Sequence, residues 1–271
     1  MTFQEKVKLR LRRHKKKLLS SCLVVIVFLL VRYSSLQERI IFQVGPYDDK
    51  KKQIIHTRKI ANLSDEALKK MPTTQVTTFH SFVIHDPDYP DIQGYFWRRA
   101  QNRELRQEDK KIMIYFKGNA ESFIEVWSPQ KYESLYNAYK RYNHDTVGFD
   151  IVEMDYPSTG ASAGQVRSDE DLRLFARRCY EYVVSQGYQQ VILHGYSLGT
   201  FSASYVAAHY HDDPRIKMLI LDSGFTSLPC FKGYSLALFL WPILRYRLSN
   251  IGNISHVKCP IFIRHGREDS V

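Results

Sequence analysis

Cysteine is scarce in this chain of 271 residues, and no group of cysteines and histidines has a zinc-binding spacing. Cys22 lies in an apolar stretch near the amino terminus, and Cys179, Cys230 and Cys259 are far apart in the rest of the chain. Three separated cysteines cannot form a framework of paired disulfide bonds. We therefore expect these thiols to behave as small buried apolar groups rather than as cross-links or metal ligands.

Excess charge is also missing from most of the chain. Residues 1–32 hold nine Lys or Arg and one Glu, so they supply +8 of the formal net charge of +11. The rest of the chain carries only +3, which is ordinary for a protein surface, so a nucleic-acid groove is not indicated. The composition, with 44% hydrophobic and 25% charged residues, is typical of a folded globular protein.

Long apolar runs are absent too. The longest, residues 18–31, follows a basic leader over residues 1–17. As a helix it would be about 21 Å long, which is short of a ~30 Å hydrocarbon core. A cleaved signal peptide has an apolar core of this length, but the long leader and the lack of a small-residue cleavage site favour retention. We predict a transmembrane signal anchor over residues 18–33, with flanking Lys17, Arg32 and Tyr33 at the interfaces.

The positive leader predicts the orientation of this anchor. The basic side should stay in the cytoplasm, which places the following chain in a lumen, such as that of the endoplasmic reticulum, or outside the cell. Asn62 and Asn253 each begin an Asn-X-Ser sequon and would then be candidate glycosylation sites. The membrane itself is thus a predicted partner, through the anchor and through anionic headgroups near the leader.

Hydrophobic periodicity changes twice after the anchor. Residues 34–74 are charged and show no sustained apolar period, so we interpret them as a linker with at most one helix. Residues 76–85 and 92–99 alternate in polarity around a turn-rich stretch, 86–91, which predicts an antiparallel hairpin. Short apolar runs then recur with helical segments between them, as in a parallel sheet with crossover helices. These runs lie at 111–116, 149–156, 190–195, 218–224 and 260–266.

The clearest crossover helix is predicted between Ser168 and Gln186. Ser168 is a suitable N-cap, and an acidic residue follows three positions later. One face of this helix is apolar, which requires a sheet beneath it. That face consists of Leu172, Phe175, Ala176, Cys179 and Val183.

The motif G-x-S-x-G occurs twice, and its context separates the two copies. A nucleophilic serine needs a sharp strand-to-helix turn with glycines on both sides. Ser197 directly follows the apolar run 191–193 and precedes a helical segment rich in small residues, so it fits such a nucleophile elbow. Ser162 is followed by several further residues before the helix start at Ser168, so it is better interpreted as a loop serine.

An elbow serine needs an acid and then a histidine after it in the chain. Asp269 follows the last apolar run and is the favoured acid, while Asp222, one strand earlier, is the competing one. Either could instead cap a helix. All ten histidines precede Asp269, with His194 just before the elbow and His265 at the end of the apolar run that leads to Asp269. We therefore expect the catalytic histidine beyond Val271, in a domain that is truncated at its carboxyl end.

These features resemble the α/β-hydrolase-domain serine hydrolases, and most closely their membrane-anchored lipases acting on monoacylglycerol and lysophosphatidylserine. The resemblance covers residues 75–271, and five stretches in the family's order carry it. They are YFKGNAES (115–122), DYPSTGASAG (155–164), GYSLGT (195–200), LDSGFTS (221–227) and HVKCPIFIRHGREDSV (256–271). The implied fold is an α/β-hydrolase domain, with a mostly parallel sheet, helices on both faces and an N-terminal hairpin, lacking its last strand and helix.

The resemblance also implies a role for each matching residue. Ser197 would be the nucleophile, Asp269 the acid, and the backbone N–H of Leu198 one donor to the oxyanion. A second donor would come from the loop near Asn119, where the family reads H-G-N-A and this chain has Lys117. That substitution puts the loop geometry in question. No cofactor or metal is implied, because hydrolysis by such a set needs only water.

A strongly apolar segment, residues 228–250, lies between the last two apolar runs. As an insert over the active face it would form a cap for an acyl chain, or it would be a helix buried in the core. Lys232, Arg245 and Arg247 would meet a phosphate headgroup there or simply be solvated.

The predicted function is therefore a membrane-anchored serine hydrolase that cleaves a lipid carboxylic ester, a monoacylglycerol or lysophospholipid, through an acyl-serine intermediate. One alternative is an acyl-protein thioesterase, which would require the domain to face the cytoplasm. The other is a membrane-tethered interaction protein without catalysis, which the Lys117 substitution and the lack of a suitably placed histidine favour.

Overall fold

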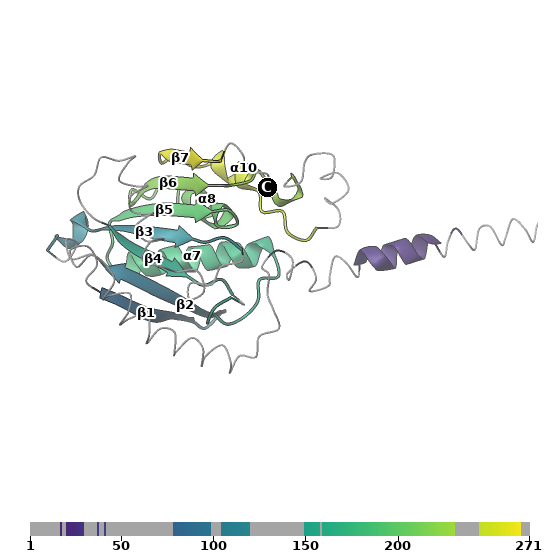
Figure 1. Cartoon of the computed structure of the whole chain (residues 1–271), viewed down its shortest axis with the longest axis horizontal. Coiled ribbons are helices and arrows are strands. Elements are labelled where there is room, and N and C mark those ends of the chain that lie inside the picture. The colour runs from purple at the N-terminus through teal and green to yellow at the C-terminus, as the bar shows by residue number, and fades with distance from the viewer. Residues whose placement is uncertain are drawn as a thin grey trace, which may run out of the picture.

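A mostly parallel sheet forms the centre of the protein (Figure 1). The computed structural model describes residues 17, 20–29, 37, 41, 78–98, 104–119, 149–157, 159–230 and 244–266. Within these residues, the seven-stranded sheet has the order β1-β2-β4-β3-β5-β6-β7. The strands are β1 (Thr78–Asp86), β2 (Tyr89–Arg98), β3 (Lys111–Phe116), β4 (Asp150–Met154), β5 (Gln190–Tyr196), β6 (Ile216–Asp222) and β7 (Ile261–Arg264).

The pairing directions confirm the predicted hairpin and parallel sheet. β2 is antiparallel to both β1 and β4, whereas the pairs from β4 through β3, β5 and β6 to β7 are parallel. The predicted turn at 86–91 is shorter than expected, because β2 already begins at Tyr89. The central strands β3, β4 and β5 are buried almost along their whole length, which explains why they appear as unbroken apolar runs.

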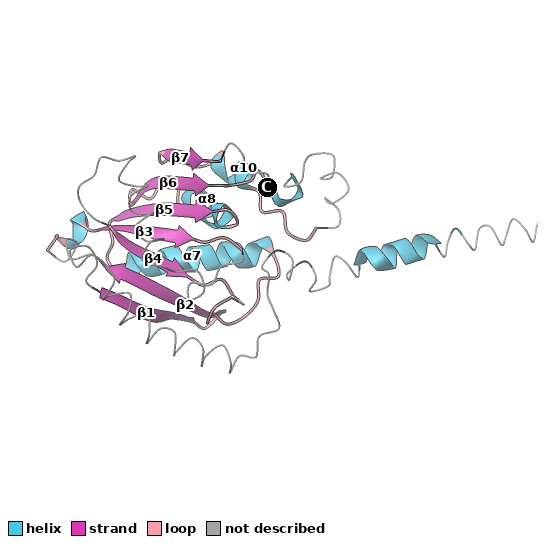
Figure 2. Cartoon of the chain, in the orientation of Figure 1, coloured by secondary structure: helices cyan, strands magenta, loops and turns pink. Residues whose placement is uncertain are grey.

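Three helices pack together beside the sheet (Figure 2). They are α7 (Asp169–Ser185), α8 (Gly199–His209) and α10 (Asn250–Ile254), and two short 3-10 turns, η1 (Gln107–Asp109) and η2 (Leu228–Cys230), lie between elements. α8 contacts β3, β5 and β6, and it also packs against α7 and α10. The start of α8 is therefore held at the centre of the sheet, next to the end of β5.

The crossover helix has the limits that the sequence predicted. α7 begins after Ser168, whose Oγ accepts a hydrogen bond from the N–H of Asp171 at 3.2 Å. Asp169, Glu170 and Asp171 place negative charge in the first turn, where it interacts favourably with the helix dipole. All the residues of its predicted apolar face are buried. Cys179 is one of them and, like the other three cysteines, is a free thiol.

The amino-terminal segment is described only in part. Residues 20–29 of the predicted anchor are helical, and side chains 23–27 are exposed. Among the residues that the structure describes, no helix is both long and apolar enough to cross a bilayer. The span over residues 18–33 thus remains a prediction. In the predicted linker, Gln37 and Ile41 are buried, and the Gln37 side chain accepts a hydrogen bond from the Arg245 N–H at 2.9 Å.

The cap of α7 gives a prediction about stability. Replacing Ser168 with Ala removes the acceptor for the Asp171 N–H, so we expect the free energy of unfolding to fall by about 1 kcal/mol. Ser185→Ala is the matched control, because that hydroxyl lies at the exposed end of the same helix, where it donates to the Tyr182 carbonyl and accepts a long hydrogen bond from the Gln186 side chain. Its effect should stay within about 0.5 kcal/mol in urea denaturation. Equal losses in the two variants would contradict a capping role for Ser168.

Candidate active site

Ser197 occupies the turn between β5 and α8. Its φ of 49° lies in the left-handed region, which is costly for a residue with a side chain. The turn is held in place by hydrogen bonds, because the Ser197 N–H donates to the Asp222 carbonyl at 2.9 Å and the Thr200 hydroxyl donates to the Ser197 carbonyl at 2.6 Å. This strained strand-to-helix turn is the geometry predicted for a nucleophile elbow.

Close packing explains both glycines of the motif. A Cβ on Gly199 would lie 1.9 Å from the Phe116 carbonyl oxygen, and a Cβ on Gly195 would lie 2.5 Å from the Gly199 carbonyl oxygen. Real Cβ atoms do not approach backbone atoms this closely, so a side chain at either position would force the elbow apart. The small residues Ser202, Ala203 and Ala207 are buried on α8, as expected for a helix close to its sheet.

The loop after β3 runs beside Ser197. Its described residues are 117–119, and a Cβ on Gly118 would lie 3.8 Å from the Ser197 Cβ. Leu198 is buried at the start of α8, so its N–H belongs to the positive end of that helix. The backbone of this loop and the first turn of α8 thus both lie close to Ser197, and the oxyanion donors near Leu198 and Asn119 stay a prediction.

The loop begins with a buried ion pair that the sequence did not reveal. Lys117 is completely buried, and its ammonium group pairs with the carboxylate of Asp155, which is equally buried. The resembling family has histidine at the position of Lys117. The backbone of Gly118 nevertheless lies beside Ser197 in this chain. Asp155 directly follows β4 at its carboxyl end and begins the stretch 155–164 that carries part of the family resemblance, but neither feature named its partner.

Ser162, in the second copy of the motif, has a structural role. Its hydroxyl is buried, donates to the Asp155 carbonyl at 2.6 Å and accepts from the Gln93 N–H at 2.9 Å. One hydrogen bond joins the loop to Asp155, just after β4, and the other joins it to Gln93 in the middle of β2. The interpretation of Ser162 as a loop serine agrees with this geometry.

Asp222 lies at the end of β6 and is paired with arginine. The Arg264 guanidinium donates to both carboxylate oxygens, one of them at 3.0 Å, whereas the His194 Nε2 is 3.8 Å from the carboxylate and beyond hydrogen-bond distance. Burial opposes ionisation of Asp222, but His194 and Arg264 outweigh it and lower the pKa of the carboxyl group to about 2. Asp222, the competing acid, is therefore ionised and engaged by Arg264.

Some of the remaining predicted site residues lie outside the described ranges, and others are described. Asp269, Asn62 and most of the apolar segment, 231–243, lie outside the described residues. The Asn253 amide, by contrast, donates to the Ser204 hydroxyl at 3.0 Å. No histidine in the described ranges forms a hydrogen bond with the Ser197 hydroxyl, and the ring of His265 lies 3.1 Å from the Gly224 carbonyl.

The end of the predicted cap is anchored on the domain. The N–H groups of Arg247 and Leu248 donate to the carboxylate of Asp169, at the start of α7. The Tyr246 hydroxyl is buried and donates to the Val166 carbonyl at 2.8 Å. The backbone that carries Arg247 is thus fixed beside α7, which limits where its guanidinium can reach.

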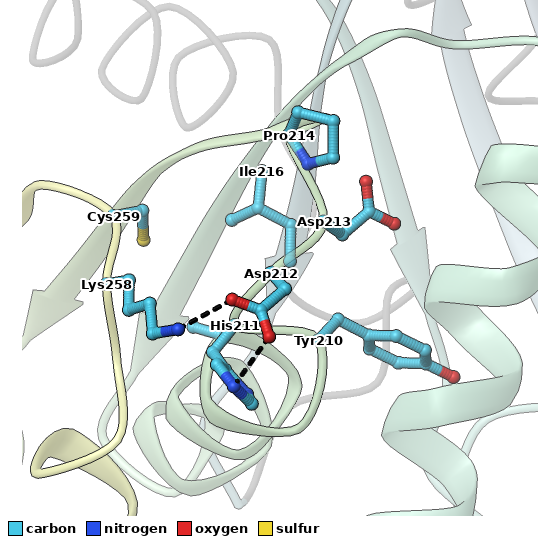
Figure 3. Close-up of a pocket in the computed structure, with 9 residues that line it drawn as sticks. Tyr210, His211, Asp212, Asp213, Pro214, Ile216, Lys258 and Cys259 are labelled. Atoms are coloured by element: carbon cyan, nitrogen blue, oxygen red, sulfur yellow. Dashed lines mark hydrogen bonds and ion pairs between the residues drawn. The ribbon is translucent and has the colours of Figure 1, made fainter.

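A pocket lies at the other end of β6 (Figure 3). His211 and Lys258 both point toward Asp212, with Nε2 and Nζ at 2.9 and 2.6 Å from its carboxylate oxygens. Burial raises the pKa of the neighbouring Cys259 thiol, which keeps it protonated. β6 runs from Ile216 at this pocket to Asp222 near Ser197, so the pocket is remote from the elbow. Across the described part of the chain, no group of His, Cys, Asp and Glu is arranged to hold a metal.

Comparisons with known proteins agree with this architecture. No family model matches the chain. Lysophosphatidylserine lipase ABHD12 of Macaca fascicularis is 25% identical over 203 residues, covering 66% of this chain and 48% of that protein. The Danio rerio protein of the same name is 25% identical over 202 residues, covering 66% and 50%. The chain thus spans about half the length of these relatives. An alpha-beta hydrolase from Vibrio vulnificus has a TM-score of 0.57 at 16% identity, covering 88% of this chain and 77% of that one.

The Asp222–Arg264 pair predicts a pH-dependent stability. Because its folded pKa of about 2 lies below the ~3.9 of an unfolded aspartate, ionised Asp222 stabilises the fold above about pH 4, and this contribution is lost as the pH falls toward about 2. Arg264→Met should lower the free energy of unfolding at neutral pH by about 1 kcal/mol, since solvent partly screens the exposed arginine. The difference in the free energy of unfolding between this variant and the unmodified protein should shrink as the pH falls from about 4 toward about 2.

Arg106→Met serves as the control for a surface pair. Arg106 pairs with Glu108 and Asp109 in an exposed setting, so its loss should cost under about 0.5 kcal/mol. Urea denaturation at several pH values measures both variants. A pH-independent effect of Arg264→Met would show that Asp222 ionisation is not what the arginine stabilises.

Proposed function

We propose that this chain, which has the α/β-hydrolase fold and resembles the lysophosphatidylserine lipases, is a serine hydrolase that cleaves lipid carboxylic esters with Ser197 as its nucleophile. The observation that carries this proposal is the strained elbow. Ser197 has a φ of 49°, and the loop 117–119 lies beside it. A buried structural serine would need neither the strained turn nor backbone donors on two sides.

The proposed reaction has two steps. The Ser197 Oγ attacks the ester carbonyl carbon while a base takes its proton, and the carbonyl oxygen becomes negatively charged. The N–H groups of Leu198 and of the loop at Asn119 would stabilise that charge, and one such donor is worth about 3–4 kcal/mol. The alcohol leaves with a proton from the same base, and water then hydrolyses the acyl-serine by the reverse sequence.

The base and its acid belong to the proposal through the family resemblance. Asp269 is the proposed acid, and the base would be a histidine that lies near it in the fold. Asp269 lies outside the described residues, and none of the described histidines bonds to the Ser197 hydroxyl. Asp222 is a weaker choice for the acid, because its carboxylate is engaged by Arg264.

The proposed substrate is a lipid with a single acyl chain, either a lysophospholipid or a monoacylglycerol. The names of the ABHD12 relatives state lysophosphatidylserine lipase activity. The apolar segment 228–250 would supply an acyl-binding surface. We also propose that residues 18–33 anchor the enzyme in the membrane where such lipids are found, with the domain on the lumenal side.

Labelling tests the nucleophile. A fluorophosphonate probe should label the unmodified protein, and Ser197→Ala should abolish both labelling and hydrolysis of lysophosphatidylserine. Ser162→Ala is the matched control from the second copy of the motif. It should lose about 1–3 kcal/mol of stability through its two buried hydrogen bonds but keep the labelling, measured well below its unfolding temperature.

The substrate panel separates the candidate activities. It contains lysophosphatidylserine, a monoacylglycerol and an S-acylated peptide, each compared with the Ser197→Ala protein. Preferential hydrolysis of the peptide would establish the thioesterase alternative. Folded protein that neither labels nor hydrolyses any of these substrates would overturn the proposal in favour of a non-catalytic protein.

The anchor gives a separate prediction. The full chain should stay in the membrane pellet after alkaline carbonate extraction, and a variant lacking residues 1–33 should be released, because the longest uncharged apolar run has been removed. Lumenal orientation predicts that Asn62→Gln removes a glycan. Asn253→Gln should have a smaller effect, since the Asn253 amide is hydrogen-bonded to Ser204. Release of the full chain by carbonate would contradict the anchor.

A further inference from the structure

We propose that Lys117 and Asp155 form a positioning pair that fixes the oxyanion loop beside Ser197, so that lysine takes over a structural task at the place where the resembling family has histidine. This inference rests on the proposed hydrolase function. It assigns a role to two residues that would not touch the substrate and that act only through the backbone of residues 117–119.

Burial makes the two charges depend on each other. Both side chains have 0% exposure, so neither charge can be solvated by water. An isolated charge in such a place would be strongly destabilising, and only a close opposite charge with further hydrogen bonds makes it tolerable. Lys117 follows β3 and Asp155 follows β4, which are adjacent parallel strands. The pair therefore joins the carboxyl ends of these two strands.

Asp155 is also bound by groups from two other segments. The Tyr95 hydroxyl on β2 donates to its Oδ2 at 3.2 Å, and the Ala161 N–H approaches the same atom at 3.4 Å. Burial and the nearby Asp155 raise the pKa of Tyr95, which keeps the phenol protonated as a donor. Gly160 passes so close that a Cβ there would lie 1.9 Å from the carboxylate oxygen. The position of Asp155 is thus determined independently of Lys117.

The backbone of Lys117 is held as firmly as its side chain. The Tyr156 hydroxyl, which is buried, donates to the Lys117 carbonyl at 2.8 Å. On the other side, a Cβ on Gly199 would lie 2.8 Å from that same carbonyl oxygen, so α8 packs directly against it. The next residue, Gly118, is the one beside Ser197. Any shift of Lys117 would therefore move the N–H groups that face the developing oxyanion.

These contacts assign positioning rather than proton transfer to Lys117. Its ammonium group is buried against Asp155 and the Tyr156 ring, 5.9 Å from the ring centre, so it is not available to a substrate. Oxyanion donors stabilise the transition state far more than the bound substrate. Loss of positioning should consequently lower kcat and leave KM nearly unchanged.

The experiment uses the full chain with three variants: Lys117→Met, Asp155→Asn and the double variant. Each single variant leaves one buried group without its charge partner, so both activity and stability should fall. The double variant removes both charges at similar volume and should recover the unfolding temperature. Its kcat for lysophosphatidylserine, and its rate of fluorophosphonate labelling, should remain about 100-fold below the unmodified protein, because a small misplacement of catalytic groups has an effect of this size.

Lys258→Met is the matched control, since Lys258 also pairs with an aspartate, Asp212, but on the exposed surface remote from Ser197. It should leave kcat and KM unchanged. A double variant that regains kcat together with its unfolding temperature would overturn the positioning role and leave a purely structural one. A rise in the KM of the double variant as large as the fall in its kcat would also overturn the positioning role. If the unmodified, folded protein neither labels nor hydrolyses, the proposed function itself fails, and the positioning role with it.

Discussion

The close approach of α8 to the ends of β3 and β5 is the constraint on which the candidate site depends. At Gly195 and Gly199 the backbones of these elements are too near for any side chain. This packing forces the chain to turn sharply at Ser197 and places the loop after β3 at the side of the serine. The strain at Ser197 is sustained by ordinary packing around it, since the surrounding strands and α8 are buried.

Two ionic contacts, one fully buried and one partly exposed, reinforce this edge of the sheet, one on each side of β5. Lys117 and Asp155 join the ends of β3 and β4, whereas Arg264 and Asp222 join the ends of β7 and β6. The second pair is linked to the elbow directly, through the Asp222 carbonyl that accepts the Ser197 N–H. Since the strands meet at one edge, these contacts fix the distances between loops that come from distant parts of the sequence.

Periodicity was sufficient to predict most of the fold, and local context predicted that Ser197 lies in a strand-to-helix turn and Ser162 in a loop. The apolar runs became strands close to their predicted limits, and Ser168 caps α7 as expected. The partners of Lys117 and Arg264 were not predictable, because each pair joins residues about 40 positions apart in the chain and no local pattern reports such a contact. Asp222 could be placed at the end of a strand from the sequence, but its engagement by Arg264 could not.

The effect of the Lys117 substitution depends on the residue that Lys117 contacts in the fold. A lysine in place of a histidine suggested a disturbed oxyanion loop when the motif was considered alone. The chemistry proposed for that loop, however, depends on backbone N–H groups, which every residue except proline supplies. What the side chain must provide is a fixed loop position, and a buried ion pair can do this at little net gain in stability. The relevant question is therefore whether an acid stands opposite the lysine, and Asp155 does.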